Sequence, residues 1–362
     1  MSTAAAPEAL EKAPNRHHFS QEVTRLTSQV VRRIRGKSRP ATVPDDQYMD
    51  RLASVEFRPV FLVADHRSGT TMASELFART KCFNYVNAYH VMHEDRLLAN
   101  HIEGVEEQAC QEIDEQCEKM GITTRGMDKI AAGADTAVDY VSFLSTATGS
   151  GILTDATVGP FEEFCKKVQY ISEPGKPLIL KSCPDYRNFL YIKSRFPQAK
   201  FVFLFRDPIR LLDSQLRIFQ KSNGNRLLAV MSEDYRRFEQ SWLFPLIRKA
   251  FSPTLGVNPG YKWLVRRMKR AEKQLFDDLP HLPESEYVML RYEDLMTDAD
   301  GEMHRILDFL NLTPPEPFHL QEWIEPRNLP LLPQIENDRP RLEAMFRRTR
   351  EFLGYTDSAA RA

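Results

Sequence analysis

The chain has 362 residues, with 49 Lys and Arg against 50 Asp and Glu, so its formal net charge is −1. This balance argues against a dedicated nucleic-acid binder, because proteins that track phosphates usually carry a clear basic excess. With 42% hydrophobic and 27% charged residues, the composition argues against intrinsic disorder. The length suits one large α/β domain or two small ones.

Cysteine content and hydropathy indicate a cytoplasmic protein. The five cysteines are an odd number with no C-x-x-C pair, which fits neither a disulfide framework nor a zinc site. No secretory signal is visible at Met1, and the longest uncharged run, Tyr140 to Thr154, is shorter than the roughly 20 apolar residues of a membrane-spanning helix. We therefore expect reduced thiols and no bound metal.

The N-terminal segment differs from the rest of the chain in composition. Val23, Leu26, Val30 and Ile34 recur at helical spacing among many arginines, which predicts a basic amphipathic helix. Such a helix either contacts an anionic membrane surface or docks on its own domain, and we favour docking. We predict an arm and linker over residues 1–50 and a single domain over residues 51–362.

Four short apolar runs, each followed by a helical pattern, predict the core of the fold. The predicted strands are Val60–Asp65, Leu178–Lys181, Lys200–Phe205 and Tyr287–Leu290. The predicted helices are residues 71–78, 184–196, 208–219 and 302–310. Asp207 and Pro208 are typical of the N-cap and first position of a helix. Strands that are apolar on both faces and alternate with helices predict a three-layer α/β/α fold with a central parallel sheet.

The loop after the first predicted strand has the composition of an anion site. It reads HRSGTT over residues 66–71, where backbone N–H groups and a helix N-terminus can face an oxyanion. Arg67 adds a forked cationic donor, Gly69 permits close approach, and Ser68, Thr70 and Thr71 add hydroxyl groups. The alternative is a P-loop kinase or other nucleotide phosphotransferase, which needs a lysine where this loop has Thr70.

A second motif, FRDPIRLLDS, follows the third predicted strand. Arg206 ends the strand, and Ser214 lies eight positions later in the next helix. Side chains from neighbouring strand ends can converge on one ligand. Arg206 and Ser214 are therefore candidates for a second phosphate group. The alternative is an arginine paired with a surface carboxylate and an exposed helical serine.

Together these motifs resemble those of the sulfotransferases that use 3′-phosphoadenosine 5′-phosphosulfate. The resemblance rests on HRSGTT after VFLVAD, FRDPIRLLDS after FVFL, RYEDL after the fourth strand, and the closing FLGY. It implies the P-loop-like sulfotransferase fold and places the chain with the bacterial and glycan-modifying branch. A histidine, His66, stands where the family often has proline.

The resemblance also assigns roles in binding the donor. It implies that Arg67 to Thr71 hold the 5′-phosphosulfate, that Arg206 and Ser214 hold the 3′-phosphate, and that Tyr292 lies near the adenine. Arg67 occupies the place of a catalytic lysine or arginine. Lys181, at the end of the second strand, is a further candidate for neutralising the leaving phosphate, with a surface lysine as the alternative.

The general base is the least determined of the predicted roles. Some family members place a histidine two residues after a strand-end lysine, but that position is Cys183 here. Others place a glutamate 20–30 residues beyond the loop, where this chain has His90, His93 and Glu94. We prefer Glu94 and then His90. Asp155 and Asp185 near other strand ends stay open.

The resulting expectation is an enzyme that transfers sulfate to a hydroxyl of a small-molecule, lipid or glycan acceptor and releases adenosine 3′,5′-bisphosphate. A relative that binds the nucleotide without catalysis is a further alternative. Neither the acceptor nor the oligomeric state is determined by these residues. The basic stretch RRMKRAEK, Arg266 to Lys273, is typical of a solvated helical face, and an anionic acceptor could also be attracted to it.

Overall fold

The computed structural model describes residues 44–124, 131–149, 151–221, 240–241, 243–252, 258–324 and 329–355. The predicted N-terminal helix lies outside these residues, so it stays a prediction. The first described element, the 3-10 helix η1 (Pro44–Ser54), runs across the predicted boundary at residue 50. Within the described ranges, no helix combines the length and apolar character that crossing a membrane requires.

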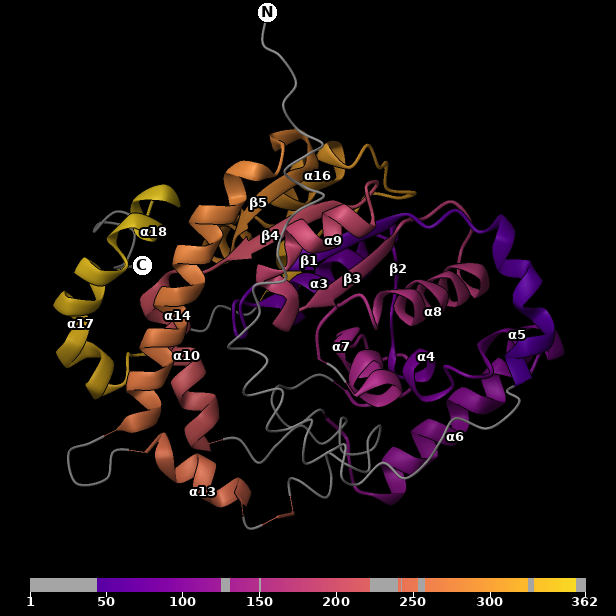
Figure 1. Cartoon of the computed structure of the whole chain (residues 1–362), viewed down its shortest axis with the longest axis horizontal. Coiled ribbons are helices and arrows are strands. Elements are labelled where there is room, and N and C mark those ends of the chain that lie inside the picture. The colour runs from indigo at the N-terminus through magenta and orange to yellow at the C-terminus, as the bar shows by residue number, and fades with distance from the viewer. Residues whose placement is uncertain are drawn as a thin grey trace, which may run out of the picture. The chain divides into compact units, whose positions relative to one another are not determined.

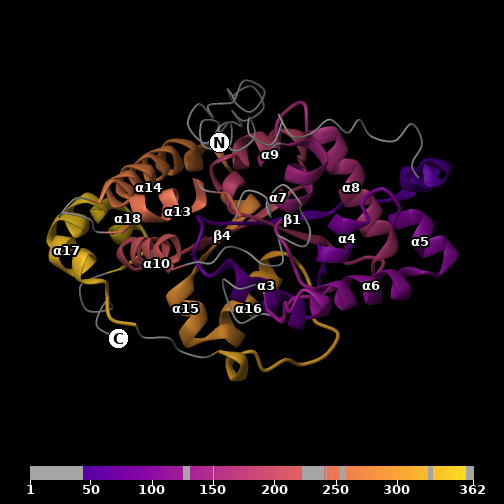
Figure 2. The same ribbon diagram turned by 90° about the horizontal axis from the view of Figure 1, so that it is seen from below.

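A five-stranded sheet with the order β2-β3-β1-β4-β5 forms the centre of the fold, and helices flank it (Figures 1 and 2). The strands are β1 (Pro59–Val63), β2 (Asn84–Tyr85), β3 (Leu178–Ser182), β4 (Lys200–Phe205) and β5 (Tyr287–Arg291). Strand β3 pairs in parallel with β1, where Phe61 lies opposite Leu180, and with β2, where Asn84 lies opposite Leu178. The predicted α/β fold with a parallel sheet is confirmed.

All four predicted strands are present to within two residues at each end. Strand β2 has only two residues, which is too short to give a pattern in the sequence. Strands β1 and β3 are buried along their whole length, as expected for strands covered on both faces. The helix expected from Pro184 to Phe196 is divided into the 3-10 turn η3 (Pro184–Arg187) and α9 (Phe189–Arg195).

The chain forms two compact units. The first contains the described parts of residues 1–63, 81–201 and 223–241. Its further helices are α4 (Ala88–Met92), α5 (Leu97–Glu103), α6 (Glu106–Lys119), α7 (Val141–Phe143), the π-helix η2 (Leu144–Thr148) and α8 (Val158–Ile171). Phe61 is fully buried among aromatic rings, with centroid distances of 6.0 Å to Tyr140 and 5.7 Å to Phe201. Helix η1 packs on α5 and α8.

The second unit contains the described parts of residues 64–80, 202–222 and 242–362. Its helices are α3 (Thr70–Arg79), α10 (Pro208–Lys221), α13 (Leu243–Ala250), α14 (Pro259–Asp278), the short η4 (Leu279–His281) and η5 (Glu284–Glu286), α15 (Tyr292–Thr297), α16 (Ala299–Phe309), η6 (Gln321–Trp323), α17 (Pro333–Met345) and α18 (Arg347–Phe352). Helices α10, α14 and α17 lie side by side (Figures 1 and 2) and share a core that includes Leu212, Leu264 and Leu342. All of the predicted donor-binding residues lie in this second unit.

Candidate functional site

The loop between β1 and α3 has an unusual backbone conformation. Arg67 has φ 74° and Gly69 has φ 99°, so two residues of the loop adopt left-handed conformations. A positive φ has a conformational energy cost for a non-glycine residue such as Arg67, and it persists only where neighbouring contacts offset that cost. Ser68 and Thr70 are buried, whereas Arg67 is half-buried and His66 is exposed. The loop thus turns its backbone sharply just before the helix N-terminus, where an anion is stabilised by N–H groups and the helix dipole.

Arg206 joins this loop to the end of β4. Its Nη1 donates a hydrogen bond of 3.2 Å to the carbonyl oxygen of Arg67. Its guanidinium carbon lies 4.3 Å from the ring centroid of Tyr292, at the start of α15, in a cation–π contact. Arg206 Nε is buried and has no hydrogen-bond partner among the described residues. A buried guanidinium donor without an acceptor favours binding of an anion at this place.

Gly69 and Ser214 complete the group. The Tyr292 ring packs so closely on Gly69 that a Cβ atom there would lie 2.3 Å from Tyr292 Cδ2. Arg67 Nε lies 3.5 Å from Ser214 Oγ of α10, at the outer limit of a hydrogen bond. Two arginines, a serine and a tyrosine ring from four parts of the chain therefore lie in one connected group of contacts. The chemistry of this group suits a ligand with two anionic centres and a flat ring.

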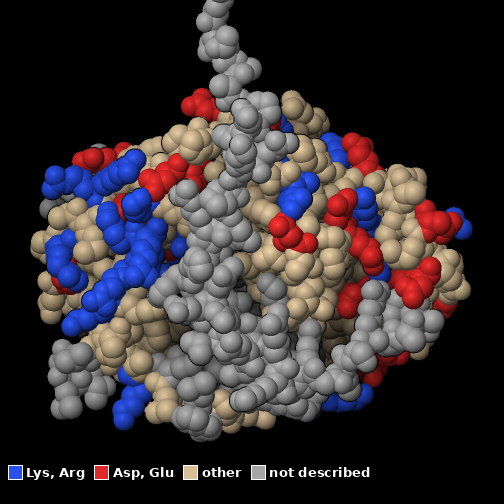
Figure 3. Space-filling view, viewed as in Figure 1, with Lys and Arg blue, Asp and Glu red and all other residues tan. Residues whose placement is uncertain are grey.

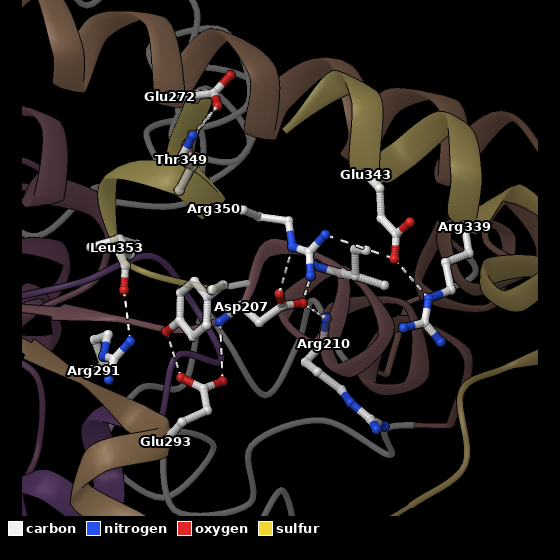
Figure 4. A network of polar contacts seen from close by, with 12 residues as sticks. Asp207, Arg210, Glu272, Arg291, Glu293, Arg339, Glu343, Thr349, Arg350 and Leu353 are labelled. Carbon is white, nitrogen blue, oxygen red and sulfur yellow. Dashed lines mark hydrogen bonds and ion pairs between the residues drawn. The ribbon is translucent and has the colours of Figure 1, made fainter. Parts of the chain in front are cut away.

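A polar network next to these residues anchors the strand ends (Figure 4). Asp207 Oδ1 accepts from the backbone N–H groups of Ile209 (2.9 Å) and Arg210 (3.1 Å), which confirms the predicted N-cap of α10. The other carboxylate oxygen of Asp207 accepts from Arg350 Nε of α18 at 3.2 Å. Glu293 Oε1 accepts from the Asp207 backbone N–H at 3.1 Å. These bonds tie the residues that follow Arg206 and Tyr292 to the C-terminal helix.

Glu293 and Tyr355 form the buried part of this network. The Tyr355 hydroxyl donates to Glu293 Oε2 at 2.5 Å, so the closing FLGY segment is bonded to RYEDL. Burial raises the pKa of Glu293 above its ordinary value, although the hydrogen bond from Tyr355 acts in the opposite direction. Burial, and then the charge of Glu293, raise the pKa of the Tyr355 hydroxyl, so tyrosine is the donor. Sequence reasoning assigned no role to either residue.

The remaining predicted residues lie in the first unit. Lys181 is nearly buried at the end of β3, and its Nζ is 2.9 Å from an Asp139 carboxylate oxygen. Its backbone carbonyl accepts from the N–H of Tyr140 at 3.1 Å. Lys181 is therefore not the solvated surface lysine of the alternative interpretation. Its charge is partly neutralised by Asp139.

His90 has a structural role at the start of α4. Its ring Nδ1 accepts from the Asn87 backbone N–H at 3.2 Å, and the His90 backbone N–H donates to Asn87 Oδ1 at 3.0 Å. These two bonds form a reciprocal capping box. Burial lowers the pKa of His90 to about 3. The ring is therefore neutral at physiological pH and a weak proton acceptor, which favours Glu94 over His90 as the base.

The other candidates for the base differ in exposure. Burial, and then Arg96, lower the pKa of half-buried His93, whose ring lies 5.2 Å from that of Tyr89. Glu94 is half-buried, and its backbone carbonyl accepts from buried Lys167 at 3.2 Å. Asp155 is exposed, and hydrogen bonds from Arg195 and then Tyr191 lower its pKa. The side chain of Asp185 lies outside the described part of the structure. Among the described residues, no three His, Cys, Asp or Glu side chains gather as metal ligands would.

Comparison with known proteins identifies a family. Residues 59–248, more than half of the chain, match the sequence model of the sulfotransferase family. The structure resembles that of sulfotransferase STF9 from Mycobacterium avium with a TM-score of 0.58 and 14% identity, covering 96% of this chain and 88% of that one. Sulfotransferase STF1 from Mycobacterium tuberculosis follows with a TM-score of 0.47 and 15% identity, covering 80% and 74%. No curated protein matches the chain in sequence.

Replacing Gly69 with alanine tests the contact with Tyr292. We expect a loss of about 2–4 kcal/mol in the free energy of unfolding, from the positive φ and from overpacking against the ring. Gly104→Ala is the matched control, because Gly104 has φ 70° and nothing within 4 Å of an added Cβ. It should cost only about 1–2 kcal/mol. Urea denaturation measures both, and a Tyr292→Ala background should remove the difference between them.

The raised pKa of Glu293 predicts a pH-dependent stability. Below the pKa of the unfolded chain, the carboxyl is protonated in both states and carries no penalty. As pH rises toward the folded pKa, the unfolded chain ionises first, so the wild type loses stability relative to Glu293→Gln. Urea denaturation between pH 4 and 7 measures this difference. A difference that is constant across that interval would contradict the raised pKa.

Proposed function

Because the chain belongs to the sulfotransferase family, we propose that it transfers the sulfuryl group of 3′-phosphoadenosine 5′-phosphosulfate to a hydroxyl group. The bond between sulfur and the bridging oxygen of the 5′-phosphate breaks, a bond from sulfur to the acceptor oxygen forms, and adenosine 3′,5′-bisphosphate leaves. The observation that carries this proposal is the buried Arg206 Nε, which has no acceptor among the described residues and lies on a guanidinium stacked against Tyr292.

The family resemblance supplies the roles of the donor-site residues. Arg206 and Ser214 bind the 3′-phosphate, and Tyr292 lies near the adenine. The loop of Arg67 to Thr71 holds the 5′-phosphosulfate with its N–H groups, two threonine hydroxyls and the Arg67 guanidinium. Arg67 and Lys181 stabilise the charge that develops on the leaving phosphate. An enzyme that hydrolyses a terminal phosphate would instead use the lysine that Thr70 replaces.

Glu94 accepts the proton of the acceptor hydroxyl in this proposal. The Glu94 side chain is half-buried, whereas His90 is neutral, buried and occupied at Nδ1. The acceptor is a carbohydrate, lipid or secondary metabolite, and no nucleic acid is involved. The family fold is compatible with all three acceptor classes, because the acceptor pocket rather than the fold sets specificity.

Titration calorimetry with adenosine 3′,5′-bisphosphate tests donor binding. The wild type should bind it and gain melting temperature, while ATP with magnesium produces a much smaller shift. Arg206→Ala should weaken binding about 10- to 100-fold, because charged hydrogen bonds to the phosphate are lost. Arg210→Ala is the control, since its Nη1 donates to the carbonyl of Leu329 instead. Equal thermal shifts with both nucleotides would favour a kinase.

Replacing Glu94 with glutamine tests the base. The rate of adenosine 3′,5′-bisphosphate release, measured with a panel of hydroxylated acceptors, should fall about 100- to 10,000-fold. Calorimetric affinity for the bisphosphate should be unchanged, because the donor residues are intact. Glu103→Gln, at an exposed position of α5, is the matched control. A normal rate in Glu94→Gln would remove this residue from the mechanism.

A further inference from the structure

Helix α14 contains a basic stretch in which Arg267 is half-buried while the other cations are exposed. Lys262, Arg266, Lys269, Arg270 and Lys273 are exposed, and Figure 3 shows Lys and Arg side chains gathered over α14, α17 and α18. Arg267 lies three residues after Leu264 and four before Ala271, both of which are buried. This spacing places Arg267 on the inner side of the helix. Its side chain is 22% exposed.

Arg267 is bonded to two nearly buried side chains. Its Nη2 lies 2.9 Å from both carboxylate oxygens of Asp65 and 2.9 Å from Gln215 Oε1. Asp65 lies two residues after the end of β1 and is 8% exposed, and Gln215 of α10 is 1% exposed. The arginine therefore neutralises a carboxylate that burial would otherwise disfavour. It also links two elements that are far from α14 in sequence.

Both partners of Arg267 are bonded to the donor loop, residues 66–71 between β1 and α3. Asp65 Oδ1 accepts from the His66 N–H at 2.7 Å, and the Asp65 carbonyl accepts from the Ser68 N–H at 3.2 Å. Gln215 Nε2 donates to the carbonyl of His66 at 2.7 Å. The residue before left-handed Arg67 is thus held at both its N–H and its carbonyl. An unfavourable φ persists only where surrounding contacts determine it.

From this arrangement we propose that Arg267 is a positioning residue for the donor loop. It orients Asp65 and Gln215, these fix the backbone at His66, and Arg67 is thereby held in the conformation that presents its N–H and guanidinium to the phosphosulfate. The role rests on the proposed function. The residue lies beyond the matched residues 59–248, so the family match does not assign it.

The test compares Arg267→Gln with Arg266→Gln, the same change at the adjacent, exposed position. Hydrogen exchange of peptides covering residues 64–72, measured without nucleotide, should be faster in Arg267→Gln only. Calorimetric affinity for adenosine 3′,5′-bisphosphate, measured well below the melting temperature, should fall about tenfold in the same variant. Arg267→Lys keeps the charge beside Asp65 and should recover part of the affinity.

Gln215→Met is a second variant that leaves the Asp65–Arg267 pair intact, in case loss of the charge prevents folding. It should also speed loop exchange and weaken bisphosphate binding. Unchanged loop exchange in both variants would overturn the positioning role. Faster exchange with unchanged affinity would overturn it as well, because the loop conformation would then not matter to the donor. Failure of the wild type to bind the bisphosphate would instead refute the proposed function.

Discussion

The hydrogen bond from Arg206 to the carbonyl of Arg67 is the contact on which the arrangement of the proposed donor site depends. It joins the end of β4 to a loop whose backbone is unfavourable by itself. The same guanidinium stacks on Tyr292, and Tyr292 packs on Gly69, so the contacts close into a ring around the loop. Loss of one member would leave a buried donor, a strained φ or an unsupported aromatic ring.

Charge is used in two different ways in this protein. Several cations are neutralised where they stand, as Arg267 is by Asp65, Lys181 by Asp139 and Arg350 by Asp207. Such pairs orient neighbouring groups, because a buried charge requires a partner. The Nε atom of Arg206 is buried and has no acceptor within the described ranges. A cation of this kind fits an oxyanion that arrives with the substrate, which is the physical basis of the proposed donor binding.

The C-terminal segment supports the same group of residues through hydrogen bonds. Tyr355 donates to Glu293, Glu293 accepts from the backbone of Asp207, and Asp207 caps α10, the helix that carries Ser214. Hydrogen bonds thus join the FLGY, RYEDL and FRDPIRLLDS motifs to one another. The match to the family ends at residue 248, yet residues beyond it hold the start of α10 and the loop after β1 in place.

The sequence by itself determined the four main strands, the N-cap at Asp207 and the position of the HRSGTT loop, residues 66–71, between a strand and a helix. These features depend on local spacing, and apolar runs or capping residues act over a few positions. It left β2 unrecognised because two residues form no pattern. It made His90 a candidate base because of its position 20–30 residues beyond the loop, and only the structure shows that the ring is buried and bonded in a capping box. Only the tertiary structure decided which cations are neutralised. Arg267 and Asp65 are 202 residues apart, and a contact at that separation is decided by how α14 packs rather than by any spacing in the chain.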